Sequence, residues 1–382
     1  MSTIKRIYKG ATMSENLKIT GIEIYKADIP FHEPFRIAIM EILCAQSVFV
    51  KIFTDKGIYG MGEANPYWGI TGETQSINIA GAVDLAKLIL GKDPLNIEER
   101  NKEMNKYLAF NSTIRSAFDM ALYDIAGKAA GLPLYALLGG GKRSFWTDNT
   151  ISIGEPEYVA KKAVDYMNQG FQAIKVKLGT TKELDIARIK SIRNAIGDKL
   201  PIRVDANQGW DYHTAVNTLK ALEPFGIEYC EQPIAHWDYD NLRRVRESTT
   251  IAIMADESLF DHHDAYKLAV GGCCDYFNIK LAKSGGIHNA LKINAIAEGA
   301  GIKCMVGCMT ETRLGLSAAA HLVSARPNIQ YADLDGYLFM KEDPIIGGAQ
   351  YNIGEITITD TPGHGADVDP AFLKSCEMIA VK

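Results

Sequence analysis

Hydrophobic and polar positions follow two different patterns along this chain, and the change comes near residue 140. Before it, β-branched and aromatic residues bounded by turn formers predict strands over residues 18–27, 46–54 and 57–63. The turn Asp55-Lys56-Gly57 predicts a hairpin between the last two strands. Helical periodicity follows over residues 76–90, 96–108 and 112–130. Strands followed by helices are typical of an α+β domain.

Beyond residue 140, short apolar runs alternate with helical stretches in eight strand–helix repeats. The predicted strands are residues 146–153, 173–178, 202–204, 227–230, 251–254, 276–279, 303–306 and 329–331. Nearly all of them read as buried strands, which favours a parallel (β/α)-barrel of modified TIM type over an open sheet. A doubly wound sheet is the alternative, but no Gly-x-Gly-x-x-Gly motif follows a strand.

These patterns divide the chain into two domains that share one active site. We predict an N-terminal tail over residues 1–17, an α+β capping domain over 18–140 and a barrel over 141–340. Residues 341–382 contain short extended pieces, and we expect this segment to return to the capping domain.

Composition excludes several classes of protein. The 382 residues are 47% hydrophobic and 23% charged, which excludes disorder. Lysine and arginine number 41 against 46 acidic residues, with the signs interspersed, so no nucleic-acid partner is expected. No apolar run reaches the roughly 18 residues of a membrane span. The start of the chain lacks a signal-peptide pattern and the seven cysteines are an odd number, so we expect a cytoplasmic protein with reduced thiols.

Charged residues at the ends of the predicted barrel strands carry the candidate chemistry. In chain order they are Lys175, Lys177, Asp205, Glu231, Asp256, Lys280, Asp333 and Asp335. The carboxyl ends of the strands of a (β/α)-barrel meet on one face, where the active sites of this fold lie. We therefore expect these side chains to converge.

Three of the acids, Asp205, Glu231 and Asp256, end the third, fourth and fifth strands. Each follows an apolar run, and the set of strand-end residues includes no histidine or cysteine as their partner. Converging carboxylates suit a hard cation with oxygen ligands, which favours Mg²⁺ over Zn²⁺. The alternative is that each acid caps the helix after its strand.

The lysines suit proton transfer. Lys175 and Lys177 are two apart on one strand, so both point to the same face, here the barrel interior. Burial, mutual repulsion and a nearby cation would lower a lysine pKa toward the ~7–8 of a general base. Lys280 lies across the barrel mouth, so a proton could leave one face of a carbon and return to the other. A surface lysine at a strand end is the alternative for Lys280.

This set resembles the muconate-lactonizing subgroup of the enolase superfamily. The surrounding segments are similar too, namely Asp205-Ala206-Asn207-Gln208-Gly209-Trp210, Glu231-Gln232-Pro233, Ala255-Asp256-Glu257-Ser258 and Asn278-Ile279-Lys280-Leu281. The resemblance covers nearly the whole chain. It implies that the three acids hold Mg²⁺, that Lys177 and Lys280 are the acid/base pair, and that Lys175 assists Lys177 electrostatically. A lysine base with Mg²⁺ stabilising an enediolate is the known chemistry of this superfamily.

The pair Asp333 and Asp335 bears on the substrate. Two acids that face one way at the mouth suit a cationic group such as a free α-ammonium. Dipeptide epimerases of this family use a similar Asp-x-Asp for the ammonium of an Ala-X dipeptide, so the resemblance implies 1,1-proton transfer at the α-carbon of residue X. The alternatives for the function are a muconate cycloisomerase, a succinylbenzoate synthase and a non-catalytic binding relative. The alternative for the two acids is that they only cap the turn that follows the strand. We expect a small-molecule substrate and a homo-oligomer.

Two capping loops are expected to select the second residue of the dipeptide. Family members that act on Glu-containing dipeptides carry an arginine where this chain has Met40, so a small or apolar residue is favoured, or a cationic one through Glu41. In the second loop, Tyr67, Trp68 and Ile70 offer an apolar lid, with a surface turn as the alternative.

Overall fold

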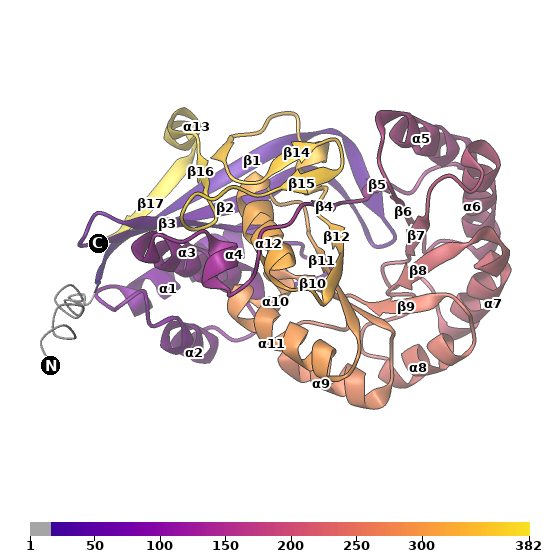
Figure 1. Ribbon diagram of the computed structural model, residues 1–382, viewed down its shortest axis with the longest axis horizontal. Coiled ribbons are helices and arrows are strands. Elements are labelled where there is room, and N and C mark those ends of the chain that lie inside the picture. Colours follow the sequence, from indigo (N-terminus) through magenta and orange to yellow (C-terminus); the bar gives the residue numbers. More distant parts are fainter. Residues whose placement is uncertain (1–16) are drawn as a thin grey trace, which may run out of the picture.

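Residues 17–382 are described by the computed structural model, and they form a cap with an antiparallel sheet beside a parallel barrel (Figure 1). The predicted fold class is confirmed. Most of the predicted N-terminal tail lies outside the described residues. Its last residue, Leu17, is buried in the core of the cap.

The cap sheet has four strands in the order β17-β1-β2-β3. Its strands are β1 (Ile19–Ile37), β2 (Met40–Thr54), β3 (Tyr59–Ala64) and β17 (Glu377–Val381). The last of these comes from the C-terminal end of the chain and pairs antiparallel with β1, with Ile24 opposite Ile379. The expected return of the C-terminal segment is thus visible in the register, while the exact domain boundaries stay a prediction.

Helices α1 (Gln75–Ile89) and α3 (Ser112–Ala130) pack on the cap sheet, and α2 (Ile97–Tyr107) packs against these two helices. Their apolar faces bury Leu85 and Phe118 against Ile24 and Val50 of the sheet. The sheet and α3 are so close that a Cβ atom on Gly62 would lie 1.9 Å from the carbonyl oxygen of Ala117. Glycine is therefore required at that point of β3.

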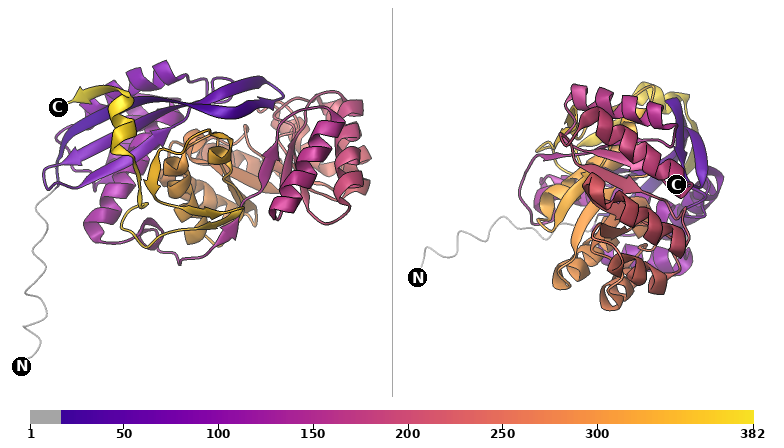
Figure 2. Two further views of the ribbon diagram at one scale, coloured as in Figure 1. Left: turned by 90° about the horizontal axis from the view of Figure 1, so that it is seen from above. Right: turned by 90° about the vertical axis from the view of Figure 1, so that its right-hand side faces the viewer.

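The hairpin of β1 and β2 is longer than the sequence predicted. Both strands continue through residues 28–45 to a two-residue turn at Ala38 and Ile39, so the first capping loop is the tip of a hairpin. Figure 2 shows this hairpin reaching over to the first barrel helix, where Lys162 donates a hydrogen bond of 2.6 Å to Glu33.

The barrel sheet contains eight parallel strands in the order β12-β11-β10-β9-β8-β7-β6-β5. They are β5 (Asn149–Ile151), β6 (Ile174–Lys177), β7 (Ile202–Asp205), β8 (Ile227–Glu231), β9 (Ala252–Ala255), β10 (Tyr276–Lys280), β11 (Lys303–Gly307) and β12 (Ile329–Asp333). At the seam between the first and last strands, Thr150 N donates to Asp335 (2.8 Å) and Leu334 N donates to Thr147 Oγ1 (2.8 Å).

Helices cover the barrel on the outside. They are α5 (Pro156–Gln169), α6 (Lys182–Ile196), α7 (Tyr212–Leu222), α8 (Tyr239–Glu247), α9 (His262–Gly271), α11 (Ile287–Gly299) and α12 (Arg313–Ala325), with the short α10 (Leu281–Ser284) directly after β10. The last of the eight predicted strand–helix repeats has no α-helix after its strand, because β12 leads into the 3₁₀ helix η3 (Gly336–Phe339). The residues directly after β12 line the site.

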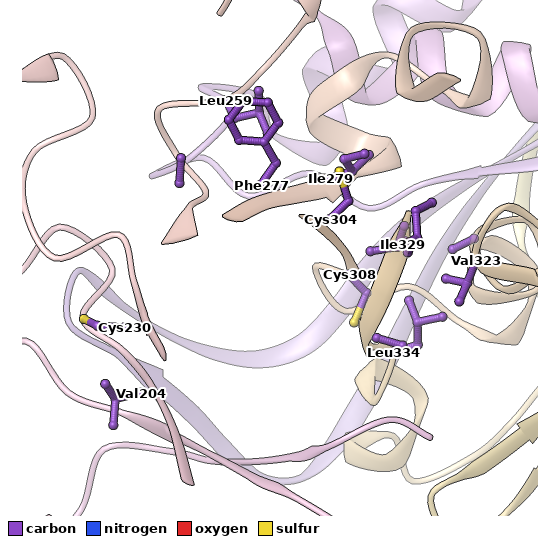
Figure 3. Close-up of a cluster of buried hydrophobic side chains, with 14 of the residues drawn as sticks. Val204, Cys230, Leu259, Phe277, Ile279, Cys304, Cys308, Val323, Ile329 and Leu334 are labelled. Atoms are coloured by element: carbon purple, nitrogen blue, oxygen red, sulfur yellow. The ribbon is translucent and has the colours of Figure 1, made fainter. Parts of the chain in front are cut away.

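Apolar side chains on the outer faces of the strands form the largest core cluster. Figure 3 shows part of it, with Val204, Cys230, Ile279 and Cys304 on separate strands. This packing fixes the strands, so their carboxyl ends are held in one rigid frame. All seven cysteines are free thiols, and five of them are buried. No helix within residues 17–382 combines the length and apolar character needed to cross a bilayer.

Small elements from the C-terminal segment fill the space between the cap and the barrel seam. Strands β14 (Gln350–Asn352) and β15 (Glu355–Thr357) add to β4 (Phe145–Trp146), and β13 (Ile345–Gly347) pairs with β16 (Ala366–Val368). The remaining short pieces are α4 (Leu134–Leu137), η2 (Glu223–Phe225) and α13 (Pro370–Ser375).

Two buried acids of the cap bind the starts of barrel helices. Asp119 on α3 accepts from the backbone N–H groups of Ile287 (2.5 Å) and His288 (3.3 Å) at the start of α11. Glu63 on β3 accepts from Thr312 N (3.0 Å) at the start of α12. Carboxylates at helix N-termini satisfy the free N–H groups there, and they fix the cap over the mouth of the barrel.

Candidate active site

The strand-end side chains converge as the repeat pattern predicted. Lys177 on β6 donates a hydrogen bond of 2.6 Å to Asp205 Oδ2 on β7, and Lys280 on β10 donates one of 2.8 Å to Asp256 Oδ2 just after β9. These side chains are buried. Charges of both signs are thus held together out of water, which is costly without such pairing.

Asp205, Glu231 and Asp256 form a cluster in which one carboxylate oxygen from each residue lies within 4.8 Å of the others. All three are fully buried. Asn278 Nδ2 donates to Glu231 Oε1 (2.7 Å) and orients that carboxylate. An all-oxygen set of this size fits Mg²⁺, whose ligands in proteins are carboxylates and water. The predicted metal is therefore supported by the geometry of the cluster.

Lys175 contacts three acids of the barrel mouth. Its ammonium lies 2.7 Å from Glu231 Oε2, 2.8 Å from Asp333 Oδ2 and 3.2 Å from Asp205 Oδ2. Burial alone would lower the pKa of Lys175, but these carboxylates outweigh it and raise that pKa well above its usual value. Burial would likewise lower the pKa of Lys280, but the carboxylates of Asp256 and Glu231 outweigh it and raise that pKa. Both pKa values are thus raised, whereas the sequence analysis expected them to be lowered by burial, mutual repulsion and a nearby cation.

The backbone after two of the metal-binding candidates adopts left-handed conformations. Asn207 has φ 39° and Gln232 has φ 31°, although neither residue is glycine. Asn207 N donates to Asp205 Oδ1 (2.9 Å), and Gln232 Oε1 accepts from Asp256 N (3.0 Å). The first bond orients the Asp205 carboxylate and the second fixes the backbone at Asp256. Strained backbone of this kind is common at functional sites.

Lys283 is a buried lysine that the sequence analysis did not select. It lies on α10, and its ammonium makes an ion pair with Asp256 Oδ1. It also donates to the backbone carbonyls of Asp256, Leu259 and Asn278. Asp256 therefore sits between two ammonium groups, those of Lys280 and Lys283, and its orientation is fixed from both sides.

Asp333 and Asp335 lie at the opposite edge of the site, and both are buried. Asp335 Oδ2 accepts from the backbone N–H of Thr150 (2.8 Å). Burial and then the charge of Asp333 raise the pKa of Asp335 to about 7. Burial acts the same way on Asp333, but the ammonium groups of Lys175 and Lys177 outweigh it and lower the pKa of that residue to about 2. With Asp148, whose carboxylate pairs with Arg203 (3.0 Å), they form a second acidic cluster.

A small cavity of about 20 Å³ lies between these groups and the cap. Lys177, Lys280, Asn207, Asp333 and Asp335 line it on the barrel side. On the cap side the lining is Phe35 and Ile37 from the hairpin, and Tyr67 and Ile70 from the loop after β3. Tyr67 is buried and donates to Thr310 Oγ1 (3.1 Å), so it is fixed to the barrel.

Three predicted substrate contacts lie outside this cavity. Met40 packs in the hairpin tip, where its Cε would be 2.1 Å from a Cβ atom on Gly69. Glu41 is exposed and makes an ion pair with Arg36, which is also exposed. Trp68 is 47% exposed. The structure thus brings together Tyr67 and Ile70 of the predicted lid at the cavity, and leaves the other three outside its lining.

Several lining residues were missed by the sequence analysis. Cys308 follows β11, lines the cavity and lies 3.8 Å from Asp335 Oδ1 through its Sγ atom. The strand-end rule that selected the lysines and acids could have found it. Phe35 and Phe339 also line the cavity, but they lie on the hairpin and on η3, where no repeat pattern marks them.

Comparison with known proteins places this architecture in a family. Residues 19–139 match the N-terminal domain of mandelate racemase and muconate lactonizing enzyme, and residues 158–372 match the enolase C-terminal domain-like family. The chain belongs to the muconate-lactonizing subgroup of the enolase superfamily, as its strand-end residues predicted.

Within that subgroup, the chain is similar to several dipeptide epimerases. It is 43% identical to a D-Ala-D/L-Ala epimerase of Cytophaga hutchinsonii over 95% of this chain and 99% of that protein. It is 44% identical to a hydrophobic dipeptide epimerase of Enterococcus faecalis, over 87% of this chain and 94% of that protein. A crystal structure of the C. hutchinsonii dipeptide epimerase with Mg and D-Ala-L-Val superposes with a TM-score of 0.95, at 42% identity, covering 96% of this chain and 100% of that one.

Proposed function

We propose that this chain is a Mg²⁺-dependent dipeptide epimerase, an isomerase that inverts the α-carbon of the C-terminal residue of an Ala-X type dipeptide. The observation that carries the proposal is the cavity into which Lys177 and Lys280 both project, beside a trio of oxygen ligands and opposite an acid pair. The dipeptide epimerases among the relatives support it.

The two lysines come from β6 and β10, which lie four strands apart in a sheet of eight, on opposite sides of the barrel. In its neutral form, one lysine takes the proton from the α-carbon, and the ammonium of the other returns a proton to the opposite face. Return from the same lysine restores the starting isomer. The cap residues Phe35, Ile37, Tyr67 and Ile70 cover the cavity on the side that faces away from the barrel.

Asp205, Glu231 and Asp256 would hold the metal ion. When bound, Mg²⁺ stabilises the second negative charge that develops on the substrate carboxylate as the α proton leaves. Lys175 does not line the cavity; its ammonium instead neutralises the acids next to Lys177. We assign it an electrostatic role.

Asp333 and Asp335 are the proposed site for the α-ammonium of the first residue. Two buried carboxylates at one edge of the cavity suit a cation, and each is held by the barrel, Asp333 by Lys175 and Asp335 by Thr150. Substrates of a cycloisomerase or a succinylbenzoate synthase carry no amine, so this pair favours the dipeptide. The apolar cap residues Ile37 and Ile70 support a small or apolar second residue.

Two further predictions concern the protein in the cell. We propose that the enzyme is a homo-oligomer and that it works in the cytoplasm, where dipeptides released from larger peptides would be its substrates.

The test is α-proton exchange in D₂O. The protein is incubated with Mg²⁺ and a library of L-Ala-L-X and D-Ala-X dipeptides, and mass spectrometry and chiral chromatography follow deuterium and configuration. We expect deuterium at the α-carbon of residue X together with inversion. Absence of exchange with every dipeptide, alongside turnover of muconate or of the succinylbenzoate precursor, would overturn the proposal.

A further inference from the structure

A second and larger cavity lies directly beside the catalytic one. Its volume is about 240 Å³, compared with about 20 Å³ for the catalytic cavity. The hairpin residues His32–Phe35 form its roof, and β5, helix α5 and the end of η3 form its sides. We call this space the side chamber. It occupies the barrel seam, where the 3₁₀ helix η3 stands in place of an eighth helix.

Three residues belong to the walls of both cavities, namely Phe35, Thr150 and Phe339. The rings of Phe35 and Phe339 contact each other, with centroids 4.7 Å apart and planes inclined by 34°. Phe35 comes from the hairpin of the cap and Phe339 from η3 of the barrel. This ring pair is therefore a wall made jointly by the two domains, and the side chamber begins behind it.

The N-terminal residue of the substrate is the part that reaches this wall. The inference rests on the proposed function, in which the α-ammonium binds Asp333 and Asp335. Asp335 accepts from the N–H of Thr150 (2.8 Å), and Thr150 is itself one of the three shared wall residues. A side chain that leaves the N-terminal α-carbon at this point meets the ring pair. The catalytic cavity is small, at about 20 Å³, so the side chamber is the larger space next to this point.

The side chamber is chemically suited to an uncharged side chain. Phe171 and Leu338 give it apolar surface, and Ile151 is buried in its wall. The charges at its rim neutralise each other, since Glu33 pairs with Lys162 at 2.6 Å. An apolar side chain of the size of leucine would fit in this volume without burying a charge.

We propose that the Phe35–Phe339 wall limits the N-terminal residue of the substrate to a small side chain, and that the side chamber is a latent subsite for a larger apolar one. Phe339 is the better residue to test, because Phe35 also lies 5.9 Å from the ammonium of Lys177 and its loss would disturb the catalytic lysine. Shortening Phe339 joins the two cavities.

The experiment compares kcat/KM for L-Ala-L-Val and L-Leu-L-Val in the wild type and in Phe339→Ala. We expect the wild type to favour the Ala substrate, and Phe339→Ala to raise the Leu/Ala ratio of kcat/KM by about tenfold or more, since this is the discrimination that apolar pockets achieve for such differences in size. An unchanged ratio overturns the inference, as does a wild type that already takes both substrates equally well.

Two further variants distinguish a specific opening of the side chamber from a general loss of packing around Phe339. Phe31 packs against Phe339 with a centroid distance of 6.3 Å and lines neither cavity, so Phe31→Leu is the matched control and should leave the ratio unchanged. Ser152 lines only the side chamber, so Phe339→Ala combined with Ser152→Phe should fill it and cancel the gain. A gain that persists in the double variant means that the large side chain lies elsewhere. Failure of the proposed function is distinct, because the wild type would then exchange neither dipeptide.

Discussion

The barrel mouth and the cap enclose the same cavity with different kinds of side chain. On the barrel side the groups are charged, buried and paired with each other, as Lys177 is with Asp205 and Lys280 with Asp256. On the cap side they are aromatic or aliphatic, as are Phe35, Ile37 and Ile70. The first set can hold a metal and move protons, and the second can only shape the space and exclude water.

The supports of the two sets differ as well. The barrel groups stand at the ends of strands whose outer faces are packed in the largest core of the molecule. The cap groups stand on a hairpin tip and a loop, which are connected to the barrel by a few contacts such as Glu33 with Lys162 and Tyr67 with Thr310. We therefore expect substitutions in the barrel mouth to abolish chemistry or metal binding, and substitutions in the cap to change the choice of substrate.

The largest effect is expected for the two lysines. In Lys280→Ala, epimerisation should be about 100- to 10,000-fold slower, because one face of the α-carbon loses its acid or base. Exchange of the α proton in D₂O should survive from one substrate epimer, and Lys177→Ala should retain it from the other. Exchange from both epimers in either variant would contradict the two-base assignment.

The next largest effect is expected for Lys283, and the affected quantity is the affinity for Mg²⁺. Its ammonium and that of Lys280 hold Asp256 from two sides, so Lys283→Met should lower the affinity for Mg²⁺ by about 10- to 100-fold. Isothermal titration of the substrate-free protein with Mg²⁺ measures this directly. Lys267→Met, at an exposed lysine on α9, is the control and should bind Mg²⁺ as the wild type does. Unchanged affinity in Lys283→Met would show that Asp256 keeps its orientation without this ammonium.

The charged side of the comparison was the more predictable one. A strand-end residue of a parallel barrel points to the shared mouth whatever the loops do, so repeat spacing alone placed Lys177, Asp205 and Asp256 correctly. The strand-end pattern did not select Lys283, because this residue lies beyond the strand on the short helix α10, where a lysine is ordinarily exposed.

The cap was less predictable for a physical reason. Residues 28–45 continue the hairpin, but Pro30 and Pro34 lack the N–H of a regular strand, and the register shifts between Pro30 and Phe35. This irregularity hides the strand pattern and leaves Phe35 looking like a loop residue. Phe339 is hidden differently, because its contact with Phe35 joins positions about 300 residues apart that only the folded chain brings together.

An intermediate effect is expected for Asp335, which belongs to the acid pair that we propose binds the α-ammonium of the substrate. Because its pKa is raised to about 7, this carboxyl becomes protonated as the pH falls below 7 and no longer attracts an ammonium group. We expect kcat/KM for L-Ala-L-Val to fall by about tenfold between pH 8 and pH 6, as the loss of one charged hydrogen bond predicts. Asp335→Asn should have the lower value at both pH values and lose this step, and a step that persists in the variant would assign it to another group.

The smallest changes in kcat/KM are expected for substitutions on the outer face of the cap. They test whether the residues that line the cavity define the substrate site, or whether the capping loops do so as a whole. Glu41 pairs with Arg36 in solvent and Trp68 is half exposed, and neither lines the cavity. Glu41→Gln and Trp68→Ala should therefore change kcat/KM by less than about twofold, because exposed ion pairs and surface substitutions contribute little. Ile70→Ala is the matched comparison in the same loop. Since Ile70 lines the cavity, its loss should alter the ranking of dipeptides by the size of residue X. A change in that ranking in Glu41→Gln, but not in Ile70→Ala, would mean that the hairpin tip closes further over the bound dipeptide and that its charged end contacts the substrate.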